Sequence, residues 1–212
     1  MMPKFRVYDK QLKEVEVTTT DQYIPNCFRT LGVNPKSDRE KNDFYATDPK
    51  AVELLLQLEN FNQNILEPAC GQGHISKVLE EHGYIVTSFD LIDRGYGTGD
   101  VDFLDYSFFF DGDIITNPPY KLALEFAKKS LEVIREGNKV ALFVKLLFLE
   151  SKSRGDFFKE NPPKRVWVSS KRLICAKNAE FDKYDSSAVA YAWVIWEKGY
   201  KGETVIDWFN ID

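Results

Sequence analysis

From residue 43 onward, short apolar runs alternate with segments whose apolar residues recur at helical spacing. The apolar runs cover residues 64–66, 84–89, 113–116 and 139–144, and the helical spacing covers residues 75–79 and 122–134. Strands that alternate with helices build a parallel sheet that is covered on both faces. The sequence therefore predicts a doubly wound α/β domain.

The end of the chain breaks this alternation. Residues 165–168 and 188–197 both have strand character, and no helix of comparable strength separates them. Consecutive strands without a crossover helix pair in antiparallel fashion. We expect an antiparallel C-terminal hairpin at one end of the otherwise parallel sheet.

The first 42 residues have a different pattern. Residues 4–8 and 14–17 each alternate around a polar centre, which predicts a small hairpin, and residues 34–42 are polar and proline-containing, which is typical of a linker. We therefore divide the chain into an N-terminal hairpin and linker, residues 1–42, and a main domain, residues 43–212.

Composition excludes several classes of protein. The longest apolar run, residues 188–196, is nine residues long, well short of the ~20 residues that cross a bilayer. No apolar stretch follows the basic residues at the start, which disfavours a signal peptide. The 3 cysteines and 2 histidines have no metal-ligand spacing. These features predict a soluble cytoplasmic protein without a metal.

The charge is unevenly distributed, although the net charge is only −5. Residues 145–183 carry ten basic and five acidic side chains, a local charge of +5, so the rest of the chain carries −10. Phosphate groups bind to such basic regions, and residues 145–187 are therefore a candidate for nucleic-acid contact. A solvated surface has the same composition, and charge alone does not separate the two.

The first candidate site is a Gly-x-Gly turn within residues 65–74, where an apolar strand runs into Gly71 and Gly73 and a helix follows. Glycines at such a turn let a ligand approach the backbone closely. The dinucleotide-binding pattern requires a third glycine where Ser76 stands. Glu67 would repel phosphates, and it suits the aminoacyl and sulfonium groups of S-adenosylmethionine (SAM). A tight turn without a ligand is the alternative.

Acidic residues downstream extend the candidate cofactor site. Asp90 ends the next strand, where a carboxylate can accept hydrogen bonds from both hydroxyls of a ribose. Asp102 and Phe103 are candidates for the amino group and the ring face of an adenine. Asp90 could equally cap its strand, and several aspartates surround Asp102.

The strongest motif is Asn117-Pro118-Pro119-Tyr120, which ends an apolar strand. Strand ends are where open α/β sheets bind ligands. A second Asn-Pro-Pro, at residues 161–163, follows a charged helical stretch and has the context of a helix stop. The first copy therefore predicts a site, and the second does not.

This tetrapeptide suits methyl transfer to a conjugated amino group. Such a nitrogen is a poor nucleophile because its lone pair is delocalised. The Asn117 side-chain oxygen and the Pro118 carbonyl can accept its two N–H bonds and favour a pyramidal nitrogen, while Tyr120 stacks on the planar substrate. A methyl donor that already carries positive charge needs no metal.

Together these motifs resemble the class I SAM-dependent amino-methyltransferases, and the chain is similar to small N6-adenine DNA methyltransferases of the kind carried by phages and prophages. The resemblance covers residues 43–200. It implies a Rossmann-like, seven-stranded, mostly parallel sheet, SAM as cofactor and DNA as substrate. It also implies that the adenine is extruded from the duplex, in a bacterial or phage-infected cytoplasm.

The resemblance further implies roles for individual residues, and Tyr45 and Thr47 match a family segment that packs over the methionine part of SAM. The implied cofactor site comprises Tyr45, Thr47, Glu67, Pro68, Ala69, Gly71, Gly73, Asp90, Leu91, Asp102, Phe103 and Asn117. The implied catalytic residues are Asn117, Pro118, Pro119 and Tyr120. The implied substrate contacts are Tyr120, Lys145, Lys171, Arg172 and Phe181, with Tyr184 as a further candidate for the aromatic that sandwiches the base.

Larger members of this family carry a target-recognition domain, and no stretch here has the length of one. DNA contact would then fall to residues 145–187 and the N-terminal region. Two alternatives keep the pocket and change the acceptor, to RNA or to a glutamine side chain of a translation release factor. The glutamine enzymes carry a helical N-terminal domain, which residues 1–42 do not predict. A third alternative is a SAM- or nucleic-acid-binding module without catalysis.

Overall fold

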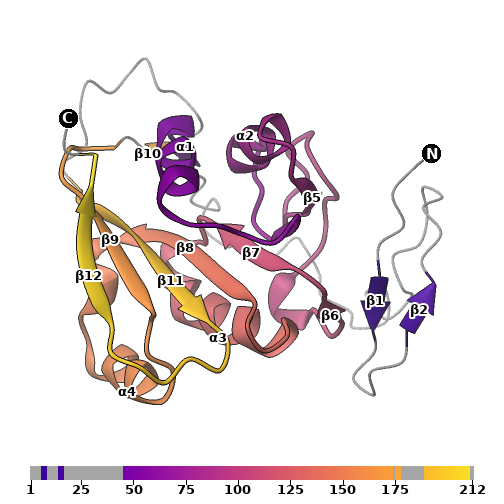
Figure 1. Cartoon of the computed structure of the whole chain (residues 1–212). Helices are drawn as coiled ribbons and strands as arrows, with labels where there is room; N and C mark the ends of the chain where they lie inside the picture. The colour runs from indigo at the N-terminus through magenta and orange to yellow at the C-terminus, as the bar shows by residue number, and fades with distance from the viewer. Residues whose placement is uncertain (1–5, 9–13, 17–44, 174, 178–188, 211–212) are drawn as a thin grey trace.

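A computed structural model describes residues 6–8, 14–16, 45–173, 175–177 and 189–210 (Figure 1). At its centre is a seven-stranded sheet with the strand order β12-β9-β11-β8-β7-β4-β5. The strands are β4 (Asn64–Glu67), β5 (Ile85–Ser88), β7 (Asp113–Thr116), β8 (Lys139–Lys145), β9 (Arg165–Ser169), β11 (Tyr191–Glu197) and β12 (Val205–Phe209).

Helices cover both faces of this sheet, as the sequence predicts. In Figure 1, α1 (Pro49–Leu58) and α2 (His74–Glu81) lie on one face, and α3 (Ala123–Val133) and α4 (Lys152–Glu160) lie on the other. Asp48 caps α1, because its carboxylate accepts a hydrogen bond from the Lys50 N–H at 3.0 Å. Short 3₁₀ turns, η2 (Phe103–Asp105), η3 (Tyr120–Leu122) and η4 (Leu146–Leu149), connect the elements.

The strand directions confirm the predicted parallel sheet and antiparallel hairpin. β5, β4, β7 and β8 pair in parallel, and β11 runs antiparallel to both β8 and β9. The sequence pattern missed β12, which pairs in parallel with β9 at the edge of the sheet. Four of its five residues are exposed, so β12 lacks the buried alternation that marks a strand.

The core forms two clusters, one on each side of the sheet. Along β8, Val140, Leu142 and Val144 face the cluster under α3 and α4, whereas Ala141 and Phe143 face the cluster under α1 and α2. This alternation of side chains is why a central strand reads as a continuous apolar run. Both faces of β8 are therefore buried.

Two small sheets lie outside the main one. β3 (Tyr45–Thr47) pairs antiparallel with β10 (Cys175–Lys177). β1 (Arg6–Tyr8) pairs antiparallel with β2 (Glu14–Glu16), which is the predicted N-terminal hairpin, and also with β6 (Phe109–Phe110). The predicted linker, residues 34–42, lies outside the described residues.

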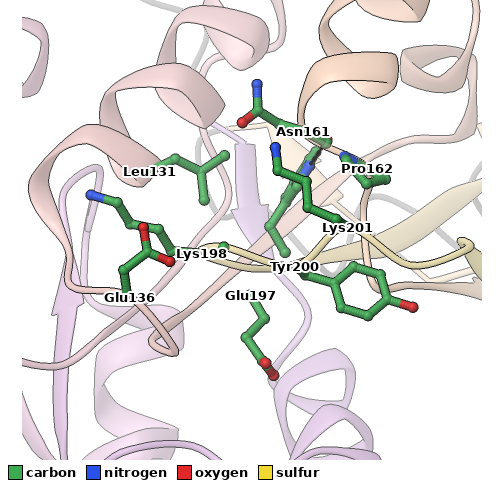
Figure 2. Close-up of a pocket in the computed structure, with 10 residues that line it drawn as sticks. Leu131, Glu136, Asn161, Pro162, Glu197, Lys198, Tyr200 and Lys201 are labelled. Carbon is green, nitrogen blue, oxygen red and sulfur yellow. Dashed lines mark hydrogen bonds between the residues drawn. The ribbon is translucent and has the colours of Figure 1, made fainter.

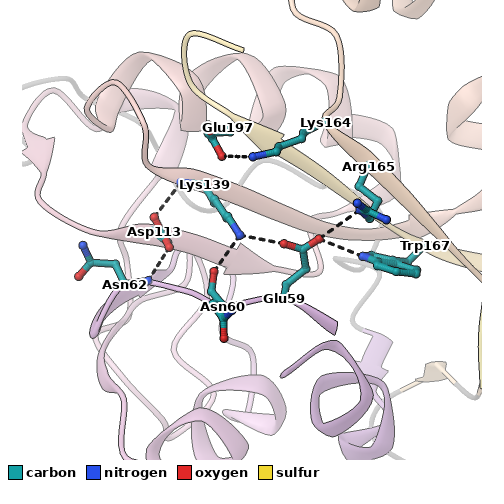
Figure 3. A network of polar contacts seen from close by, with 9 residues as sticks. All are labelled: Glu59, Asn60, Asn62, Asp113, Lys139, Lys164, Arg165, Trp167 and Glu197. Atoms are coloured by element: carbon teal, nitrogen blue, oxygen red, sulfur yellow. Dashed lines mark hydrogen bonds and ion pairs between the residues drawn. The ribbon is translucent and has the colours of Figure 1, made fainter. Parts of the chain in front are cut away.

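Polar contacts join the amino ends of the strands (Figure 3). Glu59 accepts hydrogen bonds from Lys139 at 2.8 Å and from the Trp167 indole at 3.1 Å, and its carboxylate lies 3.6 Å from Arg165. Asp113 accepts the Lys139 N–H at 2.7 Å, and burial raises the pKa of this carboxyl. These contacts brace the edge of the sheet opposite to the Asn117 motif.

Candidate active site

The two sequence motifs lie at the same edge of the sheet. β4 and β7 are adjacent and parallel, with Leu66 opposite Ile114. The carboxyl ends of adjacent parallel strands meet at one edge. The glycine turn after β4 and the Asn117 motif after β7 are therefore neighbours.

The Asn117 side chain has a fixed orientation. Its Nδ2 donates to Thr47 Oγ1 at 2.9 Å and to the Tyr45 carbonyl at 3.3 Å, and it lies 3.9 Å from Cys175 Sγ. Its Oδ1 is buried and has no hydrogen-bond partner among the residues that the structure describes. An amide with a satisfied donor and an unsatisfied acceptor offers that acceptor to a ligand.

The two prolines carry the chain from β7 into η3. Pro118 is buried and Pro119 is exposed, and the Pro119 carbonyl accepts the Leu122 N–H at 2.8 Å. Because proline fixes φ, this short connection has little freedom. It sets the position of Tyr120 relative to Asn117.

Tyr120 is held at both its ring and its hydroxyl. Its ring centroid lies 5.5 Å from that of Tyr45, and its hydroxyl donates to the Tyr191 hydroxyl at 3.2 Å. Burial raises the pKa of the Tyr120 phenol, which keeps it protonated. The Lys145 ammonium lies 4.0 Å from the centroid of the Tyr120 ring. The site therefore presents an aromatic face beside a cation.

Glu67, the last residue of β4, is fully buried beside the first turn of α2. Its carboxylate accepts hydrogen bonds from the Ser76 N–H at 2.8 Å and from the Ser76 hydroxyl. Burial raises the pKa of Glu67 well above its usual value, and the charge of Asp90 adds to this shift. Glu67 therefore ties the end of β4 to α2 and occupies one of the N–H groups that a phosphate at this helix start would need.

The raised pKa of Glu67 predicts a pH-dependent stability. Above the usual value of 4.5, the folded protein holds a proton on Glu67 that the unfolded chain has lost. Stability from this group is therefore present at low pH and is lost as pH rises through the raised pKa. We expect Glu67→Gln to become more stable relative to wild type as pH increases, in urea unfolding at several pH values above 4.5. If the stability difference between the variant and wild type did not change with pH, the raised pKa of Glu67 would be contradicted.

Asp90 joins the end of β5 to the glycine turn. One of its oxygens accepts the Gly71 N–H at 2.9 Å, and the other accepts the Ile92 N–H at 2.9 Å. A carboxylate has about four acceptor positions, so Asp90 keeps acceptor capacity for a ligand. Leu91, which follows it, is 39% exposed and offers an apolar surface at the same place.

Asp102 and Phe103 lie at the start of η2, and the Phe103 ring is placed differently from the sequence expectation. Asp102 is the N-cap of η2, and its carboxylate accepts the Leu104 N–H at 2.9 Å. Phe103 is only 1% exposed and packs against Phe126 with a centroid distance of 5.1 Å. Its ring is a core residue that supports the loop, and in this arrangement no face is open to an adenine. Pro68 is buried and Ala69 packs against the same core.

The basic segment is divided between two edges of the sheet. Lys164 and Arg165 lie at the amino edge and pair with Glu197 and Glu59, so they are not part of a ligand surface beside Tyr120. Lys171 and Arg172 are exposed just after β9, at the carboxyl edge. Lys145 ends β8 at that edge. Phe181 and Tyr184 lie outside the described residues.

A cavity of about 190 Å³ is lined by residues that include Leu131, Asn161 and Lys198, and neither the glycine turn nor residues 117–120 contribute to its wall (Figure 2). Lys198 Nζ donates to the Ile134 carbonyl at 2.7 Å, and Lys201 Nζ donates to the Glu160 carbonyl at 2.6 Å. Both ammonium groups therefore satisfy carbonyls near helix ends. Asn161 borders this cavity as the C-cap of α4, which confirms that the second Asn-Pro-Pro is a helix stop.

The described part of the chain contains neither a cluster of metal-binding side chains nor a membrane-spanning helix. No group of three or more His, Cys, Asp or Glu side chains there is arranged to hold a metal ion. In the same residues, no helix has the length and apolar character to span a bilayer.

Comparison with known proteins identifies the fold. No family model matches the sequence, and neither does any curated protein. A type I restriction-modification system methyltransferase subunit from Streptococcus thermophilus matches with a TM-score of 0.59 and 12% identity, over 79% of this chain and 48% of that one. The fold is that of the class I methyltransferases.

Two further structures show the same fold. A Listeria monocytogenes protein described as a class I S-adenosylmethionine-dependent methyltransferase matches with a TM-score of 0.54 and 15% identity, over 76% of this chain and 63% of that one. A Pyrococcus horikoshii protein described as an RNA methyltransferase matches with a TM-score of 0.53 and 14% identity, over 73% and 86% of the chains. The chain thus spans about half to two thirds of the length of the Streptococcus and Listeria proteins.

Sequence reasoning missed three residues at this edge. Ser76 is the buried partner of Glu67, and only its place in the glycine pattern could have drawn attention to it. Tyr191 holds the Tyr120 hydroxyl, and Cys175 lies beside Asn117. Burial raises the pKa of the Cys175 thiol to about 11, which keeps it neutral. No local sequence signal marks either Tyr191 or Cys175.

Proposed function

We propose that this protein transfers a methyl group from SAM to the exocyclic N6 amino group of adenine in DNA. The observation that carries this proposal is the Asn117 amide, whose Nδ2 is bonded to Thr47 while its buried Oδ1 has no partner among the described residues. The amino group of a nucleobase brings the N–H donor that this oxygen lacks. The likeness to a restriction-modification methyltransferase subunit supports DNA as the substrate.

The residues at the ends of β4 and β5 fit SAM. The N–H at the start of α2 is already bonded to Glu67, so a diphosphate ligand is disfavoured there. Asp90 retains acceptor capacity for ribose hydroxyls, and Gly71, with a φ of 55°, keeps the turn open to the ligand. When bound, SAM supplies an electrophilic methyl group on a positively charged sulfur.

The acceptor amine is prepared by the motif after β7. Asn117 Oδ1 and the Pro118 carbonyl each accept one N–H of the amine, which localises the nitrogen lone pair. Tyr120 stacks on the ring of the base, and its own contacts with Tyr45 and Tyr191 keep the base in one plane. After transfer, the nitrogen loses its extra proton to water.

The contact with Thr47 gives a prediction that separates positioning from cofactor binding. Thr47→Val keeps the shape of this buried side chain and removes the shortest of the hydrogen bonds that the Asn117 Nδ2 donates, while the Tyr45 carbonyl at 3.3 Å remains. We expect kcat to fall about tenfold, because the amide is then held only by the longer contact to the Tyr45 carbonyl and turns more easily. SAM affinity should remain unchanged, and Thr47→Ser, which retains the hydroxyl, should restore kcat.

The informative result is whether Thr47→Val changes kcat, SAM affinity or both. Direct binding of SAM by Thr47, as the family resemblance implies, would instead weaken SAM affinity in Thr47→Val. Isothermal titration with SAM and single-turnover transfer rates measure the two quantities independently.

Incubation with methyl-labelled SAM and separate pools of DNA, RNA and protein tests the proposed acceptor. We expect the label in DNA alone. Label in RNA or in glutamine side chains would assign the same pocket to another acceptor. SAM binding without label in any pool would show a module that binds the cofactor and does not catalyse.

A further inference from the structure

A cavity of about 110 Å³ lies beside Tyr120, where β7 and β8 end. Its wall combines apolar side chains, including Leu147 and Phe148, with the cations of Lys145 and Arg154. Leu147 is 66% exposed at this place. A ligand that is complementary to both the apolar and the cationic side chains carries a negative charge and an apolar or planar part.

Neither cation has a carboxylate partner among the residues that the structure describes. The Lys145 ammonium is half-buried and lies 4.0 Å from the Tyr120 ring centroid and 5.8 Å from that of Tyr45. Arg154 rests on Phe148, with its Cζ 5.5 Å from the ring centroid, and its Nη2 donates to the Leu147 carbonyl at 3.3 Å. Within the part of the chain that the structure describes, neither residue forms an ion pair.

At the opposite edge of the sheet, two cations have carboxylate partners. Lys139 pairs with Glu59 at 2.8 Å, and Lys164 pairs with Glu197 at 2.6 Å (Figure 3). A partly desolvated cation is costly without an anion. At the carboxyl edge the anion is therefore expected from a ligand.

We propose that this cavity binds a backbone phosphate of DNA next to the acceptor adenine, with Lys145 and Arg154 as its ligands. The inference rests on the proposed function, because the cavity borders the ring on which the adenine would stack. When the base stacks on Tyr120, it displaces the Lys145 ammonium from the ring face. The displaced ammonium then pairs with the phosphate of the incoming nucleotide. A protein glutamine acceptor brings no such anion.

The salt dependence of DNA binding tests this site. Lys145→Gln and Arg154→Gln are each titrated against a short fluorescein-labelled duplex that contains adenines, at several NaCl concentrations. Each lost phosphate contact makes the slope of log K against log salt shallower by about 0.9. Lys159→Gln is the matched control, because Lys159 lies on α4 with Arg154 but is 82% exposed and 3.9 Å from Asp156. Its slope should equal that of wild type.

Arg154→Lys is a second variant, which keeps the positive charge. Its slope of log K against log salt should be close to that of wild type. SAM affinity, measured for every variant, reports on the fold. Unchanged slopes in both glutamine variants, or an equal decrease in Lys159→Gln, overturn the phosphate site. If wild type methylates DNA and the slopes do not change, the proposed phosphate site is refuted and the proposed function is not. If the slopes decrease as expected but wild type methylates no DNA, the phosphate site stands and the proposed function fails.

Discussion

Replacing Asn117 with Ala is expected to reduce kcat for methyl transfer by about 100- to 1,000-fold, a loss typical of removing one preorganised hydrogen-bonding group from a site that stabilises a transition state. The Asn117 side chain offers a buried Oδ1 that has no hydrogen-bond partner among the described residues. Its removal leaves the amine planar and its lone pair delocalised. SAM affinity should change little, because Asp90 and the glycine turn remain intact.

The chain contains a matched control for this experiment. Asn161 also begins an Asn-Pro-Pro sequence, but it caps the C-terminus of α4, away from Tyr120. Asn161→Ala should transfer methyl groups at the wild-type rate. Comparable rates in Asn117→Ala and wild type would remove the catalytic role that we assign to Asn117.

Replacing Gly73 with Ala is expected to weaken both SAM binding and folding. Gly73 is the N-cap of α2 with a φ of 79°, and a Cβ built there would lie 2.5 Å from the ring of Tyr96. The left-handed backbone costs about 1–2 kcal/mol for a residue with a Cβ, and the ring must also move. We expect SAM affinity to fall by about tenfold or more, since the turn that faces the ligand is distorted.

Gly83 separates these two effects. It follows the other end of α2 with a φ of 85°, and a Cβ at Gly83 meets no atom within 4 Å. Gly83→Ala therefore reports the backbone strain alone in thermal unfolding, and it should leave SAM affinity unchanged. The double variant Gly73→Ala with Tyr96→Ala should recover part of the lost affinity. If Gly73→Ala and Gly83→Ala behaved alike, the contact with Tyr96 would have no role in the turn.

Local sequence patterns are sufficient for the main elements of the fold. Asp48 and Pro49 mark the start of α1, and the apolar run at residues 139–144 marks β8 because both faces of that strand are buried. The two Asn-Pro-Pro copies differ in what precedes them, and the structure agrees with that distinction. Each of these patterns spans only a few consecutive residues, so it can be recognised from the sequence alone.

Contacts between distant segments are beyond such reasoning. Thr47 and Asn117 are 70 residues apart along the chain, and β3, which contains Thr47, pairs with β10, which is also distant along the chain. Phe103 has the position of a ligand-binding aromatic in the sequence, yet its ring is buried against Phe126. Charge counting groups Lys145 with Lys164, although the strands place these two cations at opposite edges of the sheet.

The most direct test of this account is the nucleoside composition of DNA from host cells that lack other adenine methylation. Mass spectrometry of digested DNA should detect N6-methyl-2′-deoxyadenosine in cells that express the wild-type protein and far less of it in cells that express Asn117→Ala. Identical nucleosides from the two cultures, with the wild-type protein present in soluble form, would contradict the assignment of adenine in DNA as the acceptor.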